Sequence, residues 1–400
     1  MIHKISIENF FSIDDKQEIN FLVPANAPEG GYNRTSWADP RKRVTSVAAI
    51  FGANASGKST ILRSITATVD FLKHSRNSDV GSNIPQFMPY AKAVNYTRPT
   101  KISFELDGRL NEYLPPAIFR YELHINHNEK SIGTEVLFES LSYAPHGKFR
   151  SLFKREKQEF EFSKDFEIPK SDPRISFIRS NVSIISVLAQ FNHILSIKIL
   201  EGISSLQTNI VGLSKLDYGH HSNNNILKYY YSNPNELEDL NNVLARIDLG
   251  LEKLEFVNTP NGIAASFRHL GLDLGITYEH ESIGTQRFIG IFAQINYGLK
   301  LGGVVIIDEL DSDIHPLLIP EILSWFKDHD KNQYGAQILF TAHNPTIMDF
   351  LEKEQVFFTE KPSGKSTVIY SAKDIQGLRR EPSMMKKYLS GELGAVPHIG

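Results

Sequence analysis

The stretch "VTSVAAIFGANASGKST", residues 44–60, constrains the fold more than any other part of the sequence. Its first eight residues are mostly apolar at consecutive positions, which is typical of a strand buried on both faces of a parallel sheet. A loop with the spacing G-x-x-x-x-G-K-S follows, and residues 59–75 have the pattern of a helix. A buried strand, a glycine loop and a helix in this order form a phosphate-binding loop. The stretch therefore predicts an α/β fold with a nucleotide site where this strand ends.

The residue types of the loop fit the chemistry of a nucleoside triphosphate. Gly52 and Gly57 let backbone N–H groups curl around the β-phosphate, and the following helix points its positive end at the anion. Lys58 is placed to reach the β- and γ-phosphates, and the Ser59 hydroxyl to bind Mg²⁺. The Asn54 amide is predicted to lie near the γ-phosphate or the attacking water. The predicted nucleotide-binding residues of the loop are Gly52, Asn54, Gly57, Lys58, Ser59 and Thr60.

A fold of this kind needs a second strand that ends in carboxylates, and "GVVIIDE" (303–309) supplies it. Asp308 is predicted to hold Mg²⁺ through water, and Glu309 to accept a proton from the attacking water. Asp311 and Asp313 fall in the turn after the strand, where we expect them to contact a neighbouring subunit or to cap the next helix. A nuclease metal centre would need further acidic residues from other strands, and the sequence assigns no such set.

A third buried strand, within "QILFTAHNP" (337–345), ends in His343. A histidine at this place can bond the γ-phosphate and sense its hydrolysis. A lone histidine after a strand is more often structural. Because it follows the two motifs above in the same chain, we predict a functional role for it.

Composition limits what else the chain can do. There is no cysteine among the 400 residues, which removes disulfides, thiolate zinc sites and cysteine nucleophiles. The formal net charge of −3 gives no global basic field. Nucleic acid would therefore need a partner or local basic patches, such as 41–43 and 148–157. No window approaches eighteen uninterrupted apolar residues, and the N-terminus has no apolar signal core. We expect a soluble, cytoplasmic protein with no membrane span.

We expect a single domain over residues 1–400 with three recognisable parts. Residues 85–170 alternate apolar and polar positions and are rich in aromatic residues, which predicts a β-rich, antiparallel lobe. Residues 172–250 have apolar residues at helical spacing and are predicted to form a helical insert. Residues 251–400 carry the second and third strands and are predicted to form the C-terminal lobe of the nucleotide domain.

Together these motifs resemble the ABC-type ATPase head, as in the SMC and RecF class rather than the membrane transporters. Residues 52–60 resemble its Walker A motif, 304–309 its Walker B motif and "LDSD" (310–313) its D-loop, while His343 resembles its switch histidine. The resemblance implies an ABC-type P-loop head that uses ATP and Mg²⁺. It also implies a homodimer or higher homo-oligomer with ATP held between two heads.

The segment "ESIGTQRF" (281–288) resembles the degenerate signature motif of that class, at the start of a helix. The resemblance implies that Ser282 and Gly284 face the γ-phosphate bound to the opposite subunit, through a hydroxyl, a backbone N–H and the helix dipole. Arg287, beside this motif, is a candidate to reach across the dimer, with a role inside its own subunit as the equal alternative.

More narrowly, the chain resembles the stand-alone bacterial ATPases of the OLD, RloA/AbiL and PtuA kind. The segments that carry this resemblance are "ISIENFFSI" near the start and "KKYLSGELGAVPHI" (386–399). It implies an ATPase that controls a separate effector, a nuclease or toxin encoded nearby, in anti-phage defence. A RecF- or SMC-like head for DNA repair or chromosome maintenance is the alternative. A self-contained effector with its chemistry in residues 172–250 is a third hypothesis, which no catalytic constellation there supports.

Three departures from that group limit the resemblance. Phe11 stands where a basic residue often follows the N-F pair. Gln86 is a candidate for the glutamine loop, with an ordinary loop residue as the alternative. The chain after His343 is too short for a Toprim-sized domain, so the fused nuclease of the OLD enzymes is not expected. His220 and His221 are candidate metal ligands, although adjacent loop histidines without nearby carboxylates are more often solvated.

Overall fold

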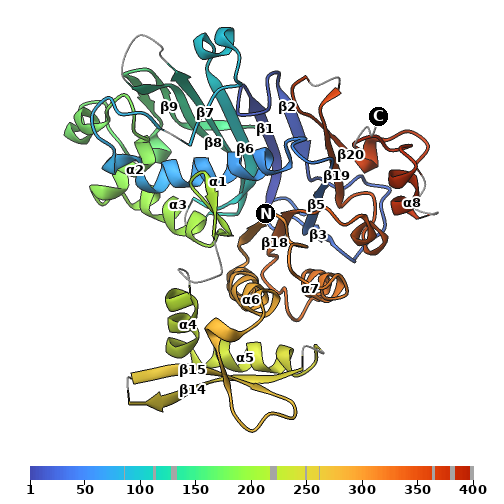
Figure 1. Cartoon of the computed structure of the whole chain (residues 1–400). Coiled ribbons are helices and arrows are strands. Elements are labelled where there is room, and N and C mark those ends of the chain that lie inside the picture. The colour runs from blue at the N-terminus through green and yellow to red at the C-terminus, as the bar shows by residue number, and fades with distance from the viewer. Residues whose placement is uncertain are drawn as a thin grey trace.

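The computed structural model describes residues 1–84, 86–110, 114–127, 133–216, 223–247, 250–260, 262–362, 365–378 and 383–396. Within these residues the chain forms a mixed α/β fold around two large sheets, with a smaller lobe extending below them (Figure 1). The predicted α/β class is therefore confirmed.

The first sheet is antiparallel and has the strand order β10-β9-β8-β7-β6-β1-β2. Buried and partly exposed residues alternate along its long strands, as the two-residue period of a strand requires. Helices α1, α2 and α3 cover one face (Figure 1). The strands are β1 (Ile2–Glu8), β2 (Gln17–Asn20), β6 (Thr100–Gly108), β7 (Ala117–His127), β8 (Thr134–Ala144), β9 (Arg150–Glu156) and β10 (Glu159–Phe162).

The second sheet has the order β11-β17-β18-β5-β19-β20, and only β20 runs antiparallel to its neighbour. Its central strands are buried on both faces because helices lie on each side, which explains their consecutive apolar residues. The strands are β5 (Val47–Phe51), β11 (Gln207–Thr208), β17 (Val304–Ile307), β18 (Gln337–Thr341), β19 (Val356–Glu360) and β20 (Val368–Ser371).

The two faces of this second sheet belong to two separate cores. Ala48 and Ile50 of β5 pack into a core shared with α1 and the first sheet. Val47, Ala49 and Phe51 point the other way, into a core with α6 and α7. The eight helices are α1 (Lys58–His74), α2 (Ile184–Gln190), α3 (Ile194–Ser204), α4 (Asn223–Ser232), α5 (Pro234–Leu244), α6 (Ile283–Leu301), α7 (Leu318–Lys327) and α8 (Met384–Leu389), counted over the described residues.

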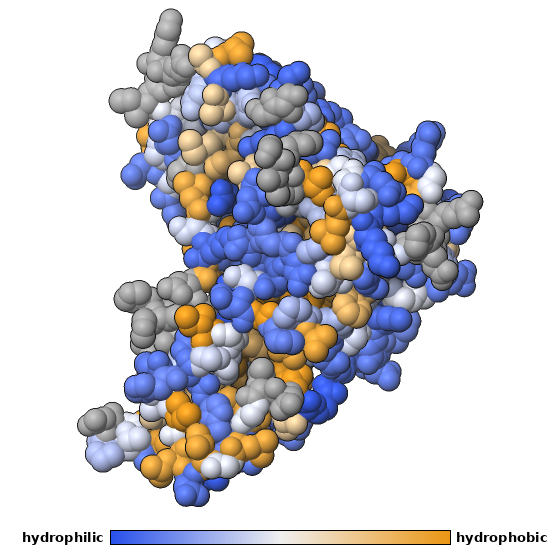
Figure 2. Space-filling view, turned by 45° about the vertical axis from the view of Figure 1, so that its right-hand side comes forward, coloured by the Kyte–Doolittle hydropathy of each residue, from blue (hydrophilic) through white to orange (hydrophobic). Residues whose placement is uncertain are grey.

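The smaller lobe combines α4 and α5 with a three-stranded sheet of β14 (Leu251–Thr259), β15 (Gly262–His269) and β16 (Ile276–Thr277). The Asn241 side chain in α5 exchanges two hydrogen bonds with the backbone of Leu254 in β14. The boundary predicted at residue 250 therefore falls inside a packed unit. Figure 2 shows apolar surface on this lobe, below an indentation that sets it off from the body.

Residues 172–250, predicted as a helical insert, contain four α-helices and also strands in the part that the structure describes. β11 joins the edge of the second sheet beside β17, and β12 (Ile210–Val211) pairs with β13 (Ser214–Lys215) in a short hairpin. Strands of two residues are too short to leave a periodic signal in the sequence, which is why the prediction missed them. A further pair, β3 (Asn33–Thr35) and β4 (Arg43–Thr45), precedes β5.

Among the described residues, no single helix has the length and apolar character needed to cross a membrane. Helices α2 and α3, bent by 112° at their break, meet that test of length and composition only as a pair.

Candidate nucleotide site

The phosphate loop leaves β5 at Gly52 and enters α1 at Lys58. Gly57 has φ of +108°, in the left-handed region that glycine tolerates best. A Cβ atom there would lie 2.2 Å from the Thr367 hydroxyl oxygen, and one at Gly52 would lie 2.3 Å from the Thr359 carbonyl oxygen. Both glycines are therefore required by close packing behind the loop as well as by its curvature.

Lys58 lies inside the curve of the loop. Its ammonium donates to the carbonyl oxygens of Gly52, at 2.8 Å, and Ala53, at 3.1 Å. Burial lowers the pKa of this lysine, and the carboxylates of Asp308 and Glu309 oppose that shift. The loop thus holds a buried cation on two neutral acceptors, which a phosphate oxygen can replace.

Asp308 connects the loop to the end of β17. The Ser59 hydroxyl donates to Asp308 Oδ1 at 2.9 Å, and the Thr341 hydroxyl donates to the same atom at 2.7 Å. Thr341 Oγ1 in turn accepts from the backbone N–H of Glu309 at 2.7 Å. Asp308 is 1% exposed, so its carboxylate is held in one place by hydroxyl groups from α1 and β18.

Glu309 and His343 lie next to each other just beyond the carboxyl ends of β17 and β18. His343 Nε2 is 3.8 Å from Glu309 Oε1, and the imidazole is 44% exposed. Glu309 has φ of +57°, which is uncommon outside glycine and turns its side chain at the end of the strand. The sequence-predicted pair is therefore together, beside Asp308, where a group bound on the loop can meet it.

Lys215 is a site residue that sequence reasoning missed. Its ammonium lies 3.1 Å from Asp308 Oδ2 and 2.6 Å from Glu309 Oε1. It comes from β13, which follows no motif in the sequence, so no local signal marked it.

Asp311 does not cap the next helix, one of the two roles predicted for it. Its Oδ2 accepts from the backbone N–H groups of His343, at 2.8 Å, and Asn344, at 2.6 Å. Helix α7 begins at Leu318 without a side-chain cap, so the prediction of a helix cap is wrong for Asp311 and Asp313. Within one subunit the D-loop-like turn instead fixes the backbone that carries His343.

The signature-like segment starts α6, where the Ser282 hydroxyl accepts from the Thr285 backbone N–H at 3.0 Å. Ser282 is exposed, and Gly284 lies against the turn after β17, since a Cβ there would be 2.6 Å from the Asp313 carbonyl oxygen. The Arg287 guanidinium donates to the Glu309 carbonyl oxygen at 2.7 Å. The structure therefore assigns Arg287 a contact within its own subunit.

The back of the phosphate loop is closed by residues from three distant segments. The Thr60 hydroxyl contacts Ser12 at 2.9 Å, and Thr367 donates to both Ser12 and the Ser56 carbonyl oxygen at 2.8 Å. The Ala53 N–H donates to the Ala395 carbonyl oxygen at 3.0 Å. Thr60 thus turns its hydroxyl to this wall rather than to the open side. Asn54, in contrast, is exposed at the front of the loop.

The donor set fits Mg²⁺. A serine hydroxyl and a carboxylate oxygen are hard oxygen ligands, and this ion commonly keeps water at its other positions. The Lys215 ammonium already lies beside Asp308 and Glu309, which shows that these carboxylates attract a cation. Among the described residues, no group of three or more His, Cys, Asp or Glu side chains could hold a metal ion. His220 and His221 lie outside the described residues.

Comparison with known families matches residues 47–349 to the one described as "AAA domain, putative AbiEii toxin, Type IV TA system". The chain belongs to this family. The family description calls its members AAA domains. Similar solved structures include "Crystal structure of the SmcHead bound to the C-winged helix domain of ScpA", with 13% identity, a TM-score of 0.45 and coverage of 92% of this chain and 97% of that chain. Another is "SMC head domain from Thermotoga maritima", with 12% identity, a TM-score of 0.43 and coverage of 92% and 98%. A search of curated proteins found no match.

Several other predicted contacts lie away from the nucleotide site of this AAA domain. Gln86 donates to Asp70 at 2.8 Å, which is about 16 Å beyond Ser59 along α1 at 1.5 Å per residue. In the 41–43 segment, Arg41 pairs with Asp39, and Arg43 donates to backbone carbonyl groups of residues 24–28. The proposed basic patch there is therefore largely used within the chain. Arg379 and Arg380, which the sequence offers as a partner or phosphate contact with a solvated helix face as the alternative, lie outside the described residues.

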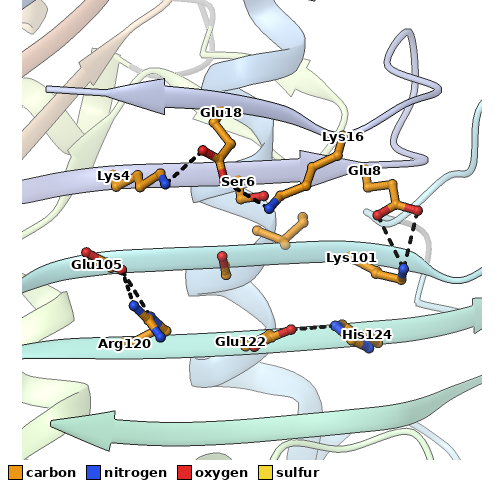
Figure 3. A pocket seen from close by; sticks show the side chains of 12 residues that line it. Lys4, Ser6, Glu8, Lys16, Glu18, Lys101, Glu105, Arg120, Glu122 and His124 are labelled. Atoms are coloured by element: carbon orange, nitrogen blue, oxygen red, sulfur yellow. Dashed lines mark hydrogen bonds and ion pairs between the residues drawn. The ribbon is translucent and has the colours of Figure 1, made fainter. Parts of the chain in front are cut away.

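The outer face of the antiparallel sheet has a shallow hollow of about 440 Å³ (Figure 3). Its charged side chains form pairs across β2, β1, β6 and β7, so the hollow offers a nucleic acid no excess of positive charge. The pairs are Lys4 and Lys16 with Glu18, Lys101 with Glu8, Arg120 with Glu105, and His124 with Glu122.

Proposed function

We propose that this AAA domain binds ATP together with Mg²⁺ and hydrolyses it to ADP and phosphate. The observation that carries the proposal is the direct hydrogen bond between the loop and the carboxylates. Ser59, which follows Lys58 in the chain, donates a hydrogen bond to Asp308, and Glu309 follows Asp308 in the chain. This is the arrangement that phosphoryl transfer needs, because positioning and charge neutralisation supply most of its catalysis.

Each side chain has a separate task in this proposal. Lys58 leaves its loop carbonyls and binds phosphate oxygens. Ser59 and Asp308 hold Mg²⁺, which supplies positive charge to the phosphates when bound. Glu309 orients the attacking water and accepts its proton, and His343 contacts the γ-phosphate. The Thr341 hydroxyl fixes the Asp308 carboxylate relative to the Glu309 backbone, because it donates to the first and accepts from the second.

Two variants test the hydrolysis proposal. Lys58→Ala should weaken binding of a fluorescent ATP analogue at least about tenfold, since a charged hydrogen-bond donor to phosphate is lost. Glu309→Gln should keep binding and release phosphate about 100-fold more slowly. Lys198→Ala, which changes an exposed lysine of α3, is the matched control. Phosphate release at the wild-type rate from Glu309→Gln would rule out the base assignment.

We further propose that ATP closes a homodimer through the start of α6. Ser282 is exposed there, beside the exposed Ile283, and the helix N-terminus presents N–H groups and positive potential to a phosphate from outside. Ser282→Arg should bind ATP as a monomer and fail to associate, whereas Glu309→Gln should accumulate the closed assembly. Sedimentation velocity with and without ATP measures both, with Ser204→Arg at the exposed end of α3 as control. ATP-driven association of Ser282→Arg would exclude this role.

We also propose that the nucleotide state controls a separate effector in anti-phage defence. The family description names a putative AbiEii toxin and a type IV TA system, which supports a link to a toxin system; the separate effector is our proposal. Tagged Glu309→Gln protein, purified from its host, should bring down a nuclease or toxin that mass spectrometry identifies. Recovery of recombination proteins or bare DNA instead would favour a repair or chromosome-maintenance role.

A further inference from the structure

The hairpin β12–β13 lies against the carboxylates that the proposed function assigns to Mg²⁺ and the attacking water. Its last residue, Lys215, contacts Asp308 Oδ2 at 3.1 Å and Glu309 Oε1 at 2.6 Å. Asp308 Oδ1 is already used by Ser59 and Thr341. The ammonium therefore occupies the second oxygen of Asp308 and one oxygen of Glu309.

The two ends of the hairpin are held very differently. At its base, Asn209 exchanges two hydrogen bonds with the Asp308 backbone, at 2.8 and 2.9 Å, and is 1% exposed. At its tip, Val211 and Leu213 are exposed, and the Leu213 carbonyl oxygen accepts one long bond from Arg63 at 3.4 Å. The ion pairs of Lys215 thus hold the outer strand against the two carboxylates, while the base stays attached through Asn209 without them.

A divalent cation at Ser59 and Asp308 changes the charge that Lys215 meets. Two cations sharing the same carboxylates repel each other, and Mg²⁺ carries twice the charge of the ammonium. The Lys215 side chain is 32% exposed, so it has a path to water when displaced. In the absence of Mg²⁺ the same ammonium keeps Asp308 and Glu309 from repelling each other.

We propose that Lys215 is a resident cation of the magnesium site, and that Mg²⁺ with nucleotide displaces it and releases the hairpin β12–β13. The proposal rests on the ATP-binding function and adds a regulatory element to it. Nucleotide occupancy is then converted into a change on the insert, at a surface distinct from the start of α6.

The first test measures how much Mg²⁺ is needed for binding. A fluorescent, non-hydrolysable ATP analogue is titrated at a series of Mg²⁺ concentrations into wild type, Lys215→Ala and the control Lys198→Ala. Lys215→Ala should reach half-maximal Mg²⁺-dependent binding at about fivefold lower Mg²⁺, because a competing, partly exposed ion pair is removed. An unchanged or higher Mg²⁺ requirement would overturn the proposal.

The second test follows the hairpin itself by amide hydrogen exchange of residues 207–216. Leu216 N–H donates to the Asn209 carbonyl oxygen at 2.7 Å, and Ile210 pairs with Lys215, so protected amides report whether the hairpin is formed. Lys215→Ala should exchange about fivefold faster there without any ligand. Wild type should reach a similar rate only with Mg²⁺ and the analogue.

The outcomes separate the two proposals. Equal exchange in wild type and Lys215→Ala without ligand overturns the inference, whether or not nucleotide binds. Analogue binding with a hairpin that stays protected also overturns it and leaves the ATP-binding function intact. Absence of analogue binding at every Mg²⁺ concentration, in wild type and control alike, contradicts the ATP-binding function itself.

Discussion

Two groups of charges, one in the antiparallel lobe and one at the nucleotide site, are built in opposite ways. In the lobe, Arg155 and Glu139 are both 0% exposed and lie 3.8 Å apart. Every nitrogen of Arg155 donates to a backbone carbonyl oxygen, and Glu139 accepts from Tyr121, Ser183 and the Ile184 backbone. At the nucleotide site, Lys58 donates to a loop carbonyl oxygen that a phosphate oxygen can replace. The side chains of Lys215, Glu309 and His343 contact one another where water can reach them.

The buried ion pair of the lobe keeps its partners permanently, whereas the charged groups of the nucleotide site can exchange theirs. Arg155 joins β9 to the segment that leads into α2, and burial raises the pKa of Glu139, so neither group has a route to a new partner. The nucleotide site keeps its cations on carbonyl oxygens and on a carboxylate edge, where an incoming phosphate or metal can substitute for them. Three predictions test this contrast, beginning with the largest expected effect.

Arg155→Ala should lower the free energy of unfolding by about 3–5 kcal/mol, since it leaves the Glu139 carboxylate buried without its cation. Urea denaturation measures the change. The neighbouring Lys154→Ala, which removes an exposed pair with Glu156, should leave the urea midpoint close to that of wild type. If the two variants lost the same stability, the distinction between buried and exposed charge would fail.

His127 of β7 gives the lobe a pH-dependent stability, because its imidazole is buried. Burial lowers the pKa of His127 to about 4, from 6.5 in the unfolded chain. The unfolded state therefore takes up the proton first, and stability should fall as pH drops from 6.5 towards 4, by about 2 kcal/mol for this residue. Urea midpoints across that range measure the slope.

The matched variant is His127→Gln, which should flatten the slope in part. The remainder is assigned to His193, whose pKa is also lowered by burial. A slope identical to that of wild type would show that His127 is not the group that titrates.

The smallest effect on stability is expected at Asp308, although it is as buried as Arg155. Asp308→Asn keeps an oxygen for Ser59 and Thr341, and Lys215 retains Glu309, so the free energy of unfolding should change by about 1 kcal/mol or less. Urea denaturation without ligand measures it, and nucleotide-dependent stabilisation by Mg²⁺ and ATP should be lost. A destabilisation as large as that of Arg155→Ala would mean that Asp308 serves the fold first.

The sequence predicted best where function depends on neighbouring residues in the chain. Gly52 to Ser59 and Asp308 with Glu309 are short motifs on buried strands, and the fold brings these motifs together as expected. Lys215 could not be predicted, because its contact depends on how a two-residue strand is placed beside β17.

The wrong predictions have a related cause. The helix cap, one of two roles predicted for Asp311, fails because its amide partners lie in the turn after β18. Of the two alternatives for Gln86, the structure favours the ordinary loop residue, because its side chain donates to Asp70 far along α1. Side-chain partners that come from other elements leave no periodic signal, whereas strand and helix patterns do.

The residues behind the phosphate loop also determine when, during synthesis on the ribosome, the loop can take its final shape. Ser12 and Thr367, which meet at 2.8 Å, are 355 residues apart, and Ala395 comes later still. Synthesis at about 5–20 residues per second separates the emergence of Gly52–Thr60 from that of its wall by roughly 15–70 seconds. During that interval the nascent chain carries the phosphate-binding motif without the groups that fix its shape. Nucleotide competence is therefore acquired only after Thr367 and Ala395 have emerged, about 300 residues behind the loop that they support.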